Sequence, residues 1–160
     1  MLRPYSHSDF ELLNSWITDA ELLLQFSGPD WQFPLTADVL NDHIQKHPDR
    51  YLYIGCTEDG EPFAFGQIIT NEANAPRLGR LLVDANMRGK GMGTQFVKEL
   101  LIECQRITAS PEIYLFVDEL NLQAIRCYEK NGFIRDTGFH EMKTTKGIVI
   151  IKRMTFKTTQ

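Results

Sequence analysis

Apolar residues along the chain follow two kinds of spacing. Where they recur every three or four residues, the spacing predicts amphipathic helices, over residues 9–17, 19–26, 36–47, 94–107 and 121–131. Short runs rich in β-branched and aromatic residues predict strands, at 2–5, 51–57, 62–70, 77–83, 112–117, 133–138 and 147–156. Strands come first and a β-α-β-α-β order follows, which predicts an α/β or α+β fold with a mixed sheet and helices on both faces.

The chain is expected to form one domain over residues 1–160, since it shows no internal repeat, linker or low-complexity segment. Residues 27–35 are rich in glycine, proline and aromatics and predict an irregular loop. Ser8 and Thr36 are expected to cap the helices that follow them. A hydrophobic content of 42% and a charged content of 24% are ordinary for a soluble globular protein.

The link between the strand at 77–83 and the next helix holds three alternating glycines. It reads Arg-Gly-Lys-Gly-Met-Gly-Thr from 88 to 94. A loop of this kind directs successive backbone N–H groups into one space at the positive end of a helix dipole, which suits a phosphate group. A Walker loop is excluded because glycine follows Lys90, and a dinucleotide fingerprint is excluded because its last glycine spacing is longer.

A second motif begins at Asn121, after the strand at 112–117. Asn121 is expected to cap a short helix. Gly132 is expected to end the helix in a left-handed conformation, with Phe133 closing that end through an apolar contact.

Together these strings resemble two motifs of the GNAT acyltransferases. Leu-Leu-Val-Asp at 81–84 with Arg-Gly-x-Gly-x-Gly at 88–93 resembles their motif A, and Asn-x-x-Ala-x-x-x-Tyr-x-x-x-Gly-Phe at 121–133 resembles their motif B. The resemblance covers roughly residues 1–156. It implies the GNAT fold, with a twisted, mixed but mostly antiparallel sheet of six to seven strands. It also implies N-acetyl transfer from acetyl-CoA to a primary amine of a small molecule or a protein N-terminus, by direct transfer and without a metal.

The resemblance also implies roles for particular residues. Backbone N–H groups of the loop hold the pyrophosphate, and the Thr94 hydroxyl adds to them. The loop residues are Arg88, Gly89, Lys90, Gly91, Met92 and Gly93. The strand edge at Leu81, Leu82 and Val83 pairs with the pantetheine arm, which Asn121 also contacts. A backbone N–H near Val83 polarises the thioester carbonyl. Tyr128 protonates the departing thiolate, because a phenol with a pKa of about 10 is a proton donor at neutral pH.

The general base stays open. Some family members carry a glutamate on the fourth strand, but that position falls near Arg77 here, which cannot accept a proton. By residue type, a water chain or one of five side chains could serve, namely Glu72, Asp118, Glu119, His43 and Tyr53. The acceptor is expected between the N-terminal helices and the sheet, in a cleft lined by Trp16, Trp31, Phe33 and Tyr53.

Charge and cysteine content add to this interpretation. Residues 1–80 hold twelve Asp or Glu and five Lys or Arg, so a cationic amine acceptor is possible. Nucleic acid and membrane are not expected as partners, and three sparse cysteines favour a cytoplasmic protein. Cys127 beside Tyr128 is either a nucleophile or a buried structural thiol, and the lack of a nearby histidine in the sequence favours the structural role. A non-catalytic acyl-CoA-binding or sensing module is the alternative function, and monomer or homodimer are both compatible with the sequence.

Overall fold

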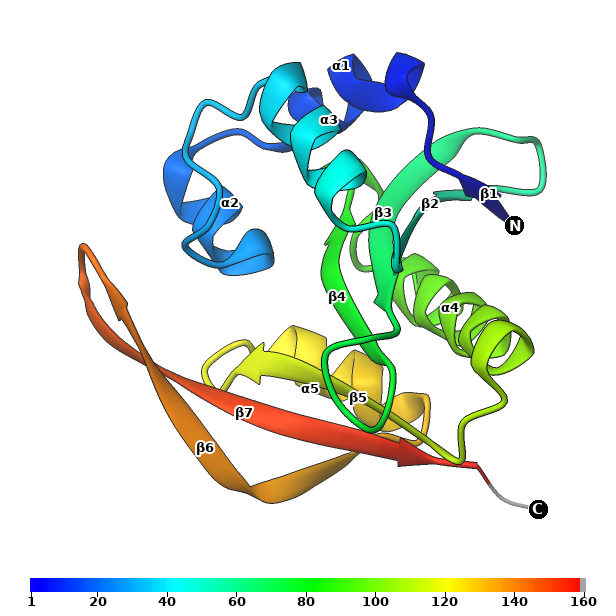
Figure 1. Cartoon of the computed structure of the whole chain (residues 1–160), viewed down its shortest axis with the longest axis vertical. Coiled ribbons are helices and arrows are strands. Elements are labelled where there is room, and N and C mark those ends of the chain that lie inside the picture. Colours follow the sequence, from blue (N-terminus) through cyan, green and yellow to red (C-terminus); the bar gives the residue numbers. More distant parts are fainter. Residues whose placement is uncertain (159–160) are drawn as a thin grey trace.

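A single seven-stranded sheet organises the protein (Figure 1). The computed structural model describes residues 1–158. The strands are β1 (Leu2–Pro4), β2 (Arg50–Cys56), β3 (Pro62–Ile69), β4 (Arg77–Val83), β5 (Glu112–Asp118), β6 (Ile134–Thr144) and β7 (Gly147–Lys157). The helices are η1 (His7–Asp9), α1 (Phe10–Trp16), α2 (Ala20–Ser27), α3 (Ala37–Lys46), η2 (Ala85–Met87), α4 (Met92–Thr108) and α5 (Leu122–Lys130).

The sheet has the order β1-β2-β3-β4-β5-β7-β6, and only the β4–β5 pair is parallel. The prediction of a mixed, mostly antiparallel sheet is therefore confirmed. Within the described chain, the ladder between β4 and β5 has one residue pair, Arg77 with Tyr114. Because neighbouring strands need continuous pairing to stay about 4.8 Å apart, β4 and β5 diverge toward their carboxyl ends, as Figure 1 shows.

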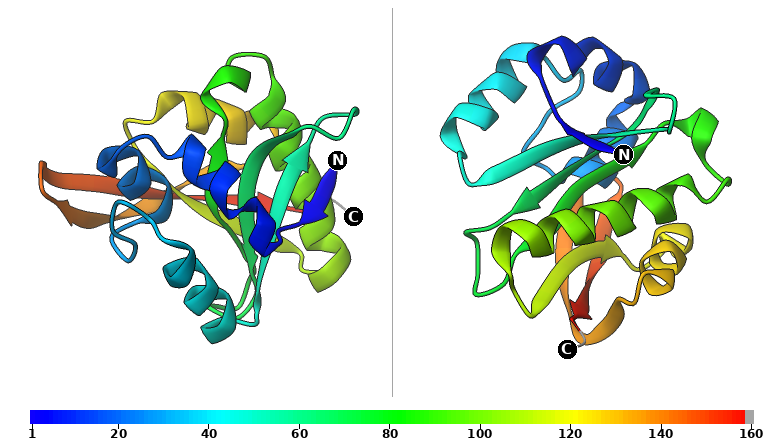
Figure 2. Two further views of the ribbon diagram at one scale, coloured as in Figure 1. Left: turned by 90° about the horizontal axis from the view of Figure 1, so that it is seen from above. Right: turned by 90° about the vertical axis from the view of Figure 1, so that its right-hand side faces the viewer.

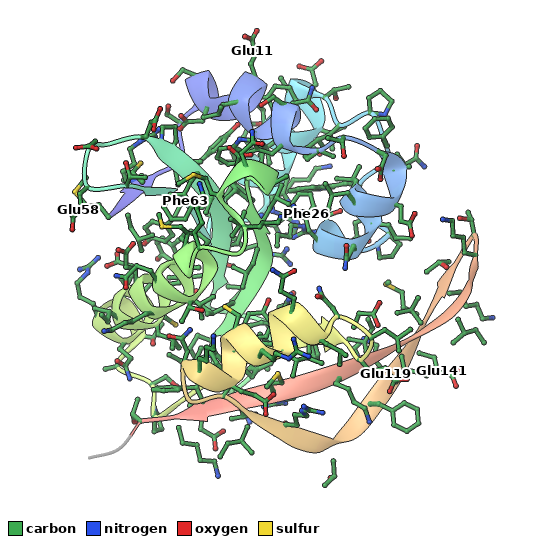
Figure 3. All side chains as sticks on the ribbon, turned by 180° about the vertical axis from the view of Figure 1, so that it is seen from behind. Glu11, Phe26, Glu58, Phe63, Glu119 and Glu141 are labelled. Carbon is green, nitrogen blue, oxygen red and sulfur yellow. The ribbon has the colours of Figure 1, made fainter. Side chains whose placement is uncertain are left out.

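Helices cover both faces of the sheet, as the sequence predicts (Figure 2). Helices α4 and α5 pack on one face, where the ring of Phe63 from β3 lies 6.2 Å from that of Phe96 from α4. Helices α1, α2 and α3 cover the N-terminal strands on the other face, around Leu13, Leu40 and Phe65. Figure 3 shows the polar side chain of Glu11 projecting away from these layers.

Two local predictions are wrong. The strand predicted at 133–138 continues to Thr144, because β6 pairs with β7 along a hairpin that projects from the body and has little buried face to produce an alternating pattern. Ser8 does not cap α1. Instead η1 begins after Ser6, whose backbone N–H donates to the Asp9 carboxylate at 2.8 Å. The Thr36 cap is confirmed, since its hydroxyl accepts the Val39 N–H at 3.3 Å.

Candidate active site

The glycine loop after β4 is shaped by backbone conformation. Gly89 and Gly91 have φ values of 78° and 76°, in the left-handed region where any other residue is strained. A Cβ atom built on either glycine would meet no protein atom within 4 Å, so the space beside them is open. Gly91 is the N-cap of the 17-residue helix α4, whose first amides have no partner within the helix. This arrangement suits the pyrophosphate of coenzyme A.

Gly93 differs from the other two glycines. Its φ is not positive, and an added Cβ would make ordinary contacts at 3.7 Å with Val83 and 3.9 Å with Cys127. Lys90 and Met92 are not among the residues that line the cleft described below. Their contact with a phosphate through backbone N–H groups stays a prediction of the motif.

The end of β4 presents backbone groups to the space between β4 and β5. The Asp84 N–H donates to the Phe63 carbonyl at 2.8 Å, so it points toward β3. Successive amides of a strand point to opposite sides, which turns the Val83 N–H toward β5. The Val83 carbonyl accepts a bond from Arg88 Nε at 3.1 Å. The position of the Val83 N–H is compatible with the predicted role in polarising a thioester carbonyl.

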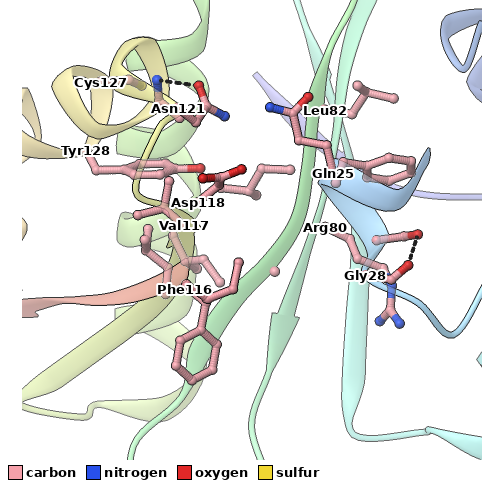
Figure 4. Close-up of a pocket in the computed structure, with 18 of the residues that line it drawn as sticks. Gln25, Gly28, Arg80, Leu82, Phe116, Val117, Asp118, Asn121, Cys127 and Tyr128 are labelled. Carbon is pink, nitrogen blue, oxygen red and sulfur yellow. Dashed lines mark hydrogen bonds between the residues drawn. The ribbon is translucent and has the colours of Figure 1, made fainter. Parts of the chain in front are cut away.

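Tyr128 reaches the same space from α5. Its ring packs edge-on against Phe133 with 6.0 Å between centroids, and Figure 4 shows its hydroxyl directed across the cleft toward β4. Burial raises the pKa of the Tyr128 phenol above its usual value, so the hydroxyl stays protonated at neutral pH. Asn121 also lines the cleft, and its side-chain oxygen caps α5 by accepting the Ala124 N–H at 3.3 Å.

Cys127 is held in a structural arrangement beside the loop. The Thr94 hydroxyl lies 3.7 Å from its sulfur, and Asn131 Nδ2 donates both to the Thr94 carbonyl at 3.1 Å and to the Cys127 carbonyl at 3.0 Å. These bonds fix the start of α4 against α5. Burial raises the pKa of the Cys127 thiol, so the reactive thiolate is disfavoured.

One continuous cleft of about 1060 Å³ joins these features. It is bounded by α2, β4, β5, α5 and the β6–β7 hairpin, and the hairpin turn meets α2 through an ion pair between Lys146 and Glu21 at 2.8 Å. The lining includes most of the sequence-predicted residues, namely Leu81, Leu82, Val83, Arg88, Gly89, Gly91, Gly93, Thr94, Asn121 and Tyr128.

The end of the cleft that lies away from the glycine loop carries arginines. Arg50, Arg77 and Arg80 line it together with the Glu72 carboxylate. Sequence reasoning missed these residues as a group. The available signal was the single charged residue Arg80 within the apolar run 78–83.

The expected aromatic lining is wrong. Trp16 and Trp31 are buried in the core beneath the N-terminal helices, Phe33 lies outside the cleft, and the Tyr53 hydroxyl donates to Glu103 of α4 at 2.9 Å. The large apolar rings of Trp16 and Trp31 pack in the core. The Phe and Tyr residues that line the cleft are instead Phe26, Phe96, Phe116 and Tyr128.

Of the possible general bases, two line the cleft. Glu72 is engaged by two arginines, while Asp118 uses Oδ1 to accept the Leu120 N–H at 2.9 Å and keeps its other carboxylate oxygen free of protein partners in the described chain. Three others, Glu119, His43 and Tyr53, do not line it.

Residues 1–158 contain no group of three or more His, Cys, Asp or Glu side chains able to hold a metal ion. In the same part of the chain, no helix has the length and apolar character needed to span a membrane.

Comparison with known proteins agrees with this geometry. The chain is 27% identical over 154 residues to an aminoglycoside N(6')-acetyltransferase type 1 of Klebsiella pneumoniae, covering 84% of this chain and 73% of the relative. It is 25% identical over 134 residues to the spermidine N(1)-acetyltransferase of Escherichia coli strain K12, covering 82% and 71%.

Solved structures show the same fold. The structure of AAC(6')-Ib with ribostamycin and coenzyme A has a TM-score of 0.75 and 25% identity, covering 98% of this chain and 92% of the other. The spermidine N-acetyltransferase of Vibrio cholerae with CoA and spermine has a TM-score of 0.80 and 17% identity, covering 98% and 94%. Residues 13–133 match the model of the acetyltransferase (GNAT) family. The chain therefore belongs to the GNAT family of acetyltransferases and is an acetyl-CoA-dependent N-acetyltransferase.

Proposed function

We propose that the protein acetylates a primary amine of a small molecule by direct transfer, with both substrates bound at once. One observation carries this proposal. The cleft runs without interruption from the glycine loop, past Val83 and Tyr128, to the polar end at Arg77 and Glu72. Donor and acceptor can therefore enter the same space from different directions and meet between β4 and β5.

A covalent acetyl-enzyme is not needed. Cys127 is the nearest thiol, but its raised pKa disfavours the thiolate that such a route requires. Holding two reactants side by side instead turns a bimolecular step into an effectively unimolecular one.

The residues that would hold coenzyme A are the loop amides from Arg88 to Gly93, the Thr94 hydroxyl, the β4 edge at 81–83 and Asn121. When bound, acetyl-CoA supplies the acetyl group as an activated thioester. The Val83 N–H stabilises the negative charge that develops on the carbonyl oxygen. This requires the thioester to lie along the edge of β4 that faces β5.

Two side chains move the protons. Asp118 takes a proton from the acceptor's ammonium group, which frees the nitrogen lone pair to form the new carbon–nitrogen bond. Tyr128 gives its proton to the sulfur as the carbon–sulfur bond breaks. Figure 4 supports these roles because both side chains project into the cleft from the β5–α5 side.

We expect the acceptor to be small because chain segments flank the outer end of the cleft. The hairpin turn at Lys146 contacts Glu21 of α2, so chain segments lie on both sides of the acceptor space. The relatives act on polyamines and aminoglycosides, which are polycations. Here, however, once Arg88, Arg126 and Lys130 near the loop are set aside for the phosphates of coenzyme A, four Lys or Arg residues and four Asp or Glu residues line the rest of the cleft. This lining lacks the excess of negative charge that would attract a polycation.

Two-substrate kinetics test the proposal. Initial rates with acetyl-CoA and a panel of amines should give intersecting lines in double-reciprocal plots, which indicate a ternary complex. Parallel lines, or release of one equivalent of CoA before any amine is added, would point to an acetyl-enzyme instead. Cys127→Ala should keep kcat within about threefold of the parent, because a thiol held in a structural role contributes little to the rate.

A further inference from the structure

The acceptor end of the cleft holds three arginines from two strands. Ile69 of β3 pairs with Arg50 of β2 on one side and with Arg77 of β4 on the other, so these two arginines lie in one row across the sheet. Arg80 lies further along β4, where an irregularity in the β3–β4 register gives it a φ of 48°. All three side chains are mostly buried yet line the cleft.

The carboxylates nearby do not balance this charge. Glu72 is shared, with Oε1 3.0 Å from Arg50 and Oε2 2.7 Å from Arg77. The nearest carboxylate of Arg80 is Asp30 at 3.7 Å, and the Asp30 side chain is 80% exposed. A long ion pair with such an exposed partner offsets little of the cost of burying a guanidinium.

Arg80 is also poorly supplied with hydrogen-bond acceptors. Its side chain is 9% exposed, and its guanidinium stacks on Trp31 at 4.3 Å. It makes one long contact of 3.5 Å with Gln67 Oε1. Within the described chain the Nε atoms of Arg80 and Arg50 have no hydrogen-bond partner. Both atoms are hydrogen-bond donors, so this end of the cleft lacks acceptors for its arginines.

The positive charge is not explained by coenzyme A. The phosphate loop begins after the carboxyl end of β4, whereas Arg77 lies at its other end, six residues or roughly 20 Å away along the strand. Arg88, Arg126 and Lys130 line the part of the cleft nearer the loop and α5 and are available for the phosphates. The arginines at the opposite end therefore face the second substrate.

We infer that this end of the cleft is a carboxylate-binding subsite, and that the acceptor is an amine that also carries a carboxylate, such as an amino acid or short peptide. The inference rests on the proposed function and specifies its acceptor. Arg80 binds the carboxylate, Arg77 contributes to the positive field, and Glu72 holds Arg50 and Arg77 in place. Planar guanidinium groups match the two oxygens of a carboxylate.

Matched acceptors test this inference. Each amino acid is compared with the amine that lacks its carboxylate and with its amide, for example lysine, cadaverine and lysinamide, and dipeptides are compared with free amino acids. The kcat/KM measured from CoA release should be about 10- to 100-fold higher for the amino acids. The amines and amides lose a hydrogen-bonded charge pair with the arginines. The comparison of dipeptides with free amino acids shows which of these two classes of acceptor the cleft prefers. Preference for cadaverine or spermidine would overturn the inference while leaving amine acetylation intact.

Variants separate the subsite from general effects. Arg80→Gln should lower kcat/KM for the preferred acid about 10- to 100-fold, mainly through KM, with little change in KM for acetyl-CoA. If Arg80→Gln fails to fold, Arg77→Gln takes its place, because the Arg77 side chain is more exposed. It should change kcat/KM in the same direction. Arg135→Gln is the control, because Arg135 pairs with Glu129 outside the cleft. Equal losses for acid and amine substrates would refute the subsite.

Product binding provides a readout that does not depend on turnover. Calorimetry with the CoA-loaded protein compares an N-acetyl amino acid with the N-acetyl amine that lacks the carboxylate. The acid should bind at least about tenfold more tightly to the parent protein, and Arg80→Gln should remove that difference. Equal affinities would overturn the subsite. Loss of CoA release with every amine would instead refute the proposed function.

Discussion

Removing the Tyr128 hydroxyl should separate catalysis from binding and from stability. The Tyr128→Phe ring keeps its edge-on contact with Phe133 at 6.0 Å. Figure 4 draws no hydrogen bond between the Tyr128 hydroxyl and the cleft residues shown, so the change leaves none of them without a partner. We expect the free energy of unfolding to change by less than about 0.5 kcal/mol. If the hydroxyl protonates the thiolate, kcat should fall by about 10²- to 10⁴-fold, which corresponds to about 3–5 kcal/mol of activation free energy.

The assay measures CoA release at saturating concentrations of both substrates, with the affinity for CoA determined by calorimetry and stability by urea unfolding. Tyr114→Phe is the matched control, because Tyr114 loses the same hydroxyl on β5 but does not line the cleft. A kcat within threefold of the parent, or a loss matched by an equal loss of CoA affinity, would remove Tyr128 from the acid role.

Three further predictions concern other parts of the protein. Gly91→Glu and Gly60→Glu both force a side chain into a left-handed conformation with open space around it, and both should lose about 1–2 kcal/mol of stability; only Gly91→Glu should weaken CoA binding, measured by calorimetry, and equal affinities would refute the loop assignment. Asp118→Asn should lower kcat about 10²- to 10⁴-fold while CoA affinity persists, and an unchanged rate would exclude Asp118 as the base. Burial, with the Arg80 and Arg50 charges, lowers the pKa of His43 to about 4. Because this folded-state pKa lies below the unfolded value near 6.5, the free energy of unfolding should fall by about 2–3 kcal/mol between pH 6.5 and 4. His43→Phe should flatten this dependence on pH, as measured by urea unfolding at several pH values.

The glycine loop could be predicted from sequence because its determinants are local. Gly89 and Gly91 occupy positions with positive φ, and the helix that follows shows its own periodicity. The caps at Thr36 and Asn121 are equally local, since each side chain bonds an amide three residues ahead. Turns and helix caps of this kind depend on only a few residues that are adjacent in the sequence.

The arginine cluster could not be predicted, because it depends on pairing between distant segments. Arg50 and Arg77 meet across Ile69 only when β2, β3 and β4 adopt one particular register. Glu72 joins them from a loop that has no sequence signal. The aromatic lining failed for a related reason. A Trp or Tyr in the sequence does not show whether its ring faces the core or a cleft, and Trp31 and Tyr53 both face the core.

The single residue pair between β4 and β5 has a consequence for backbone dynamics. In most sheets, amides of central strands exchange with deuterium far more slowly than those at the edges. Here the facing edges of two central strands lack a ladder beyond Arg77 and Tyr114 in the described chain. Their amides should take up deuterium like those of edge strands. A pantetheine chain that pairs with the edge of β4 would slow this uptake. Deuterium-exchange mass spectrometry of the β4 and β5 amides could therefore follow how much of the protein has coenzyme A bound.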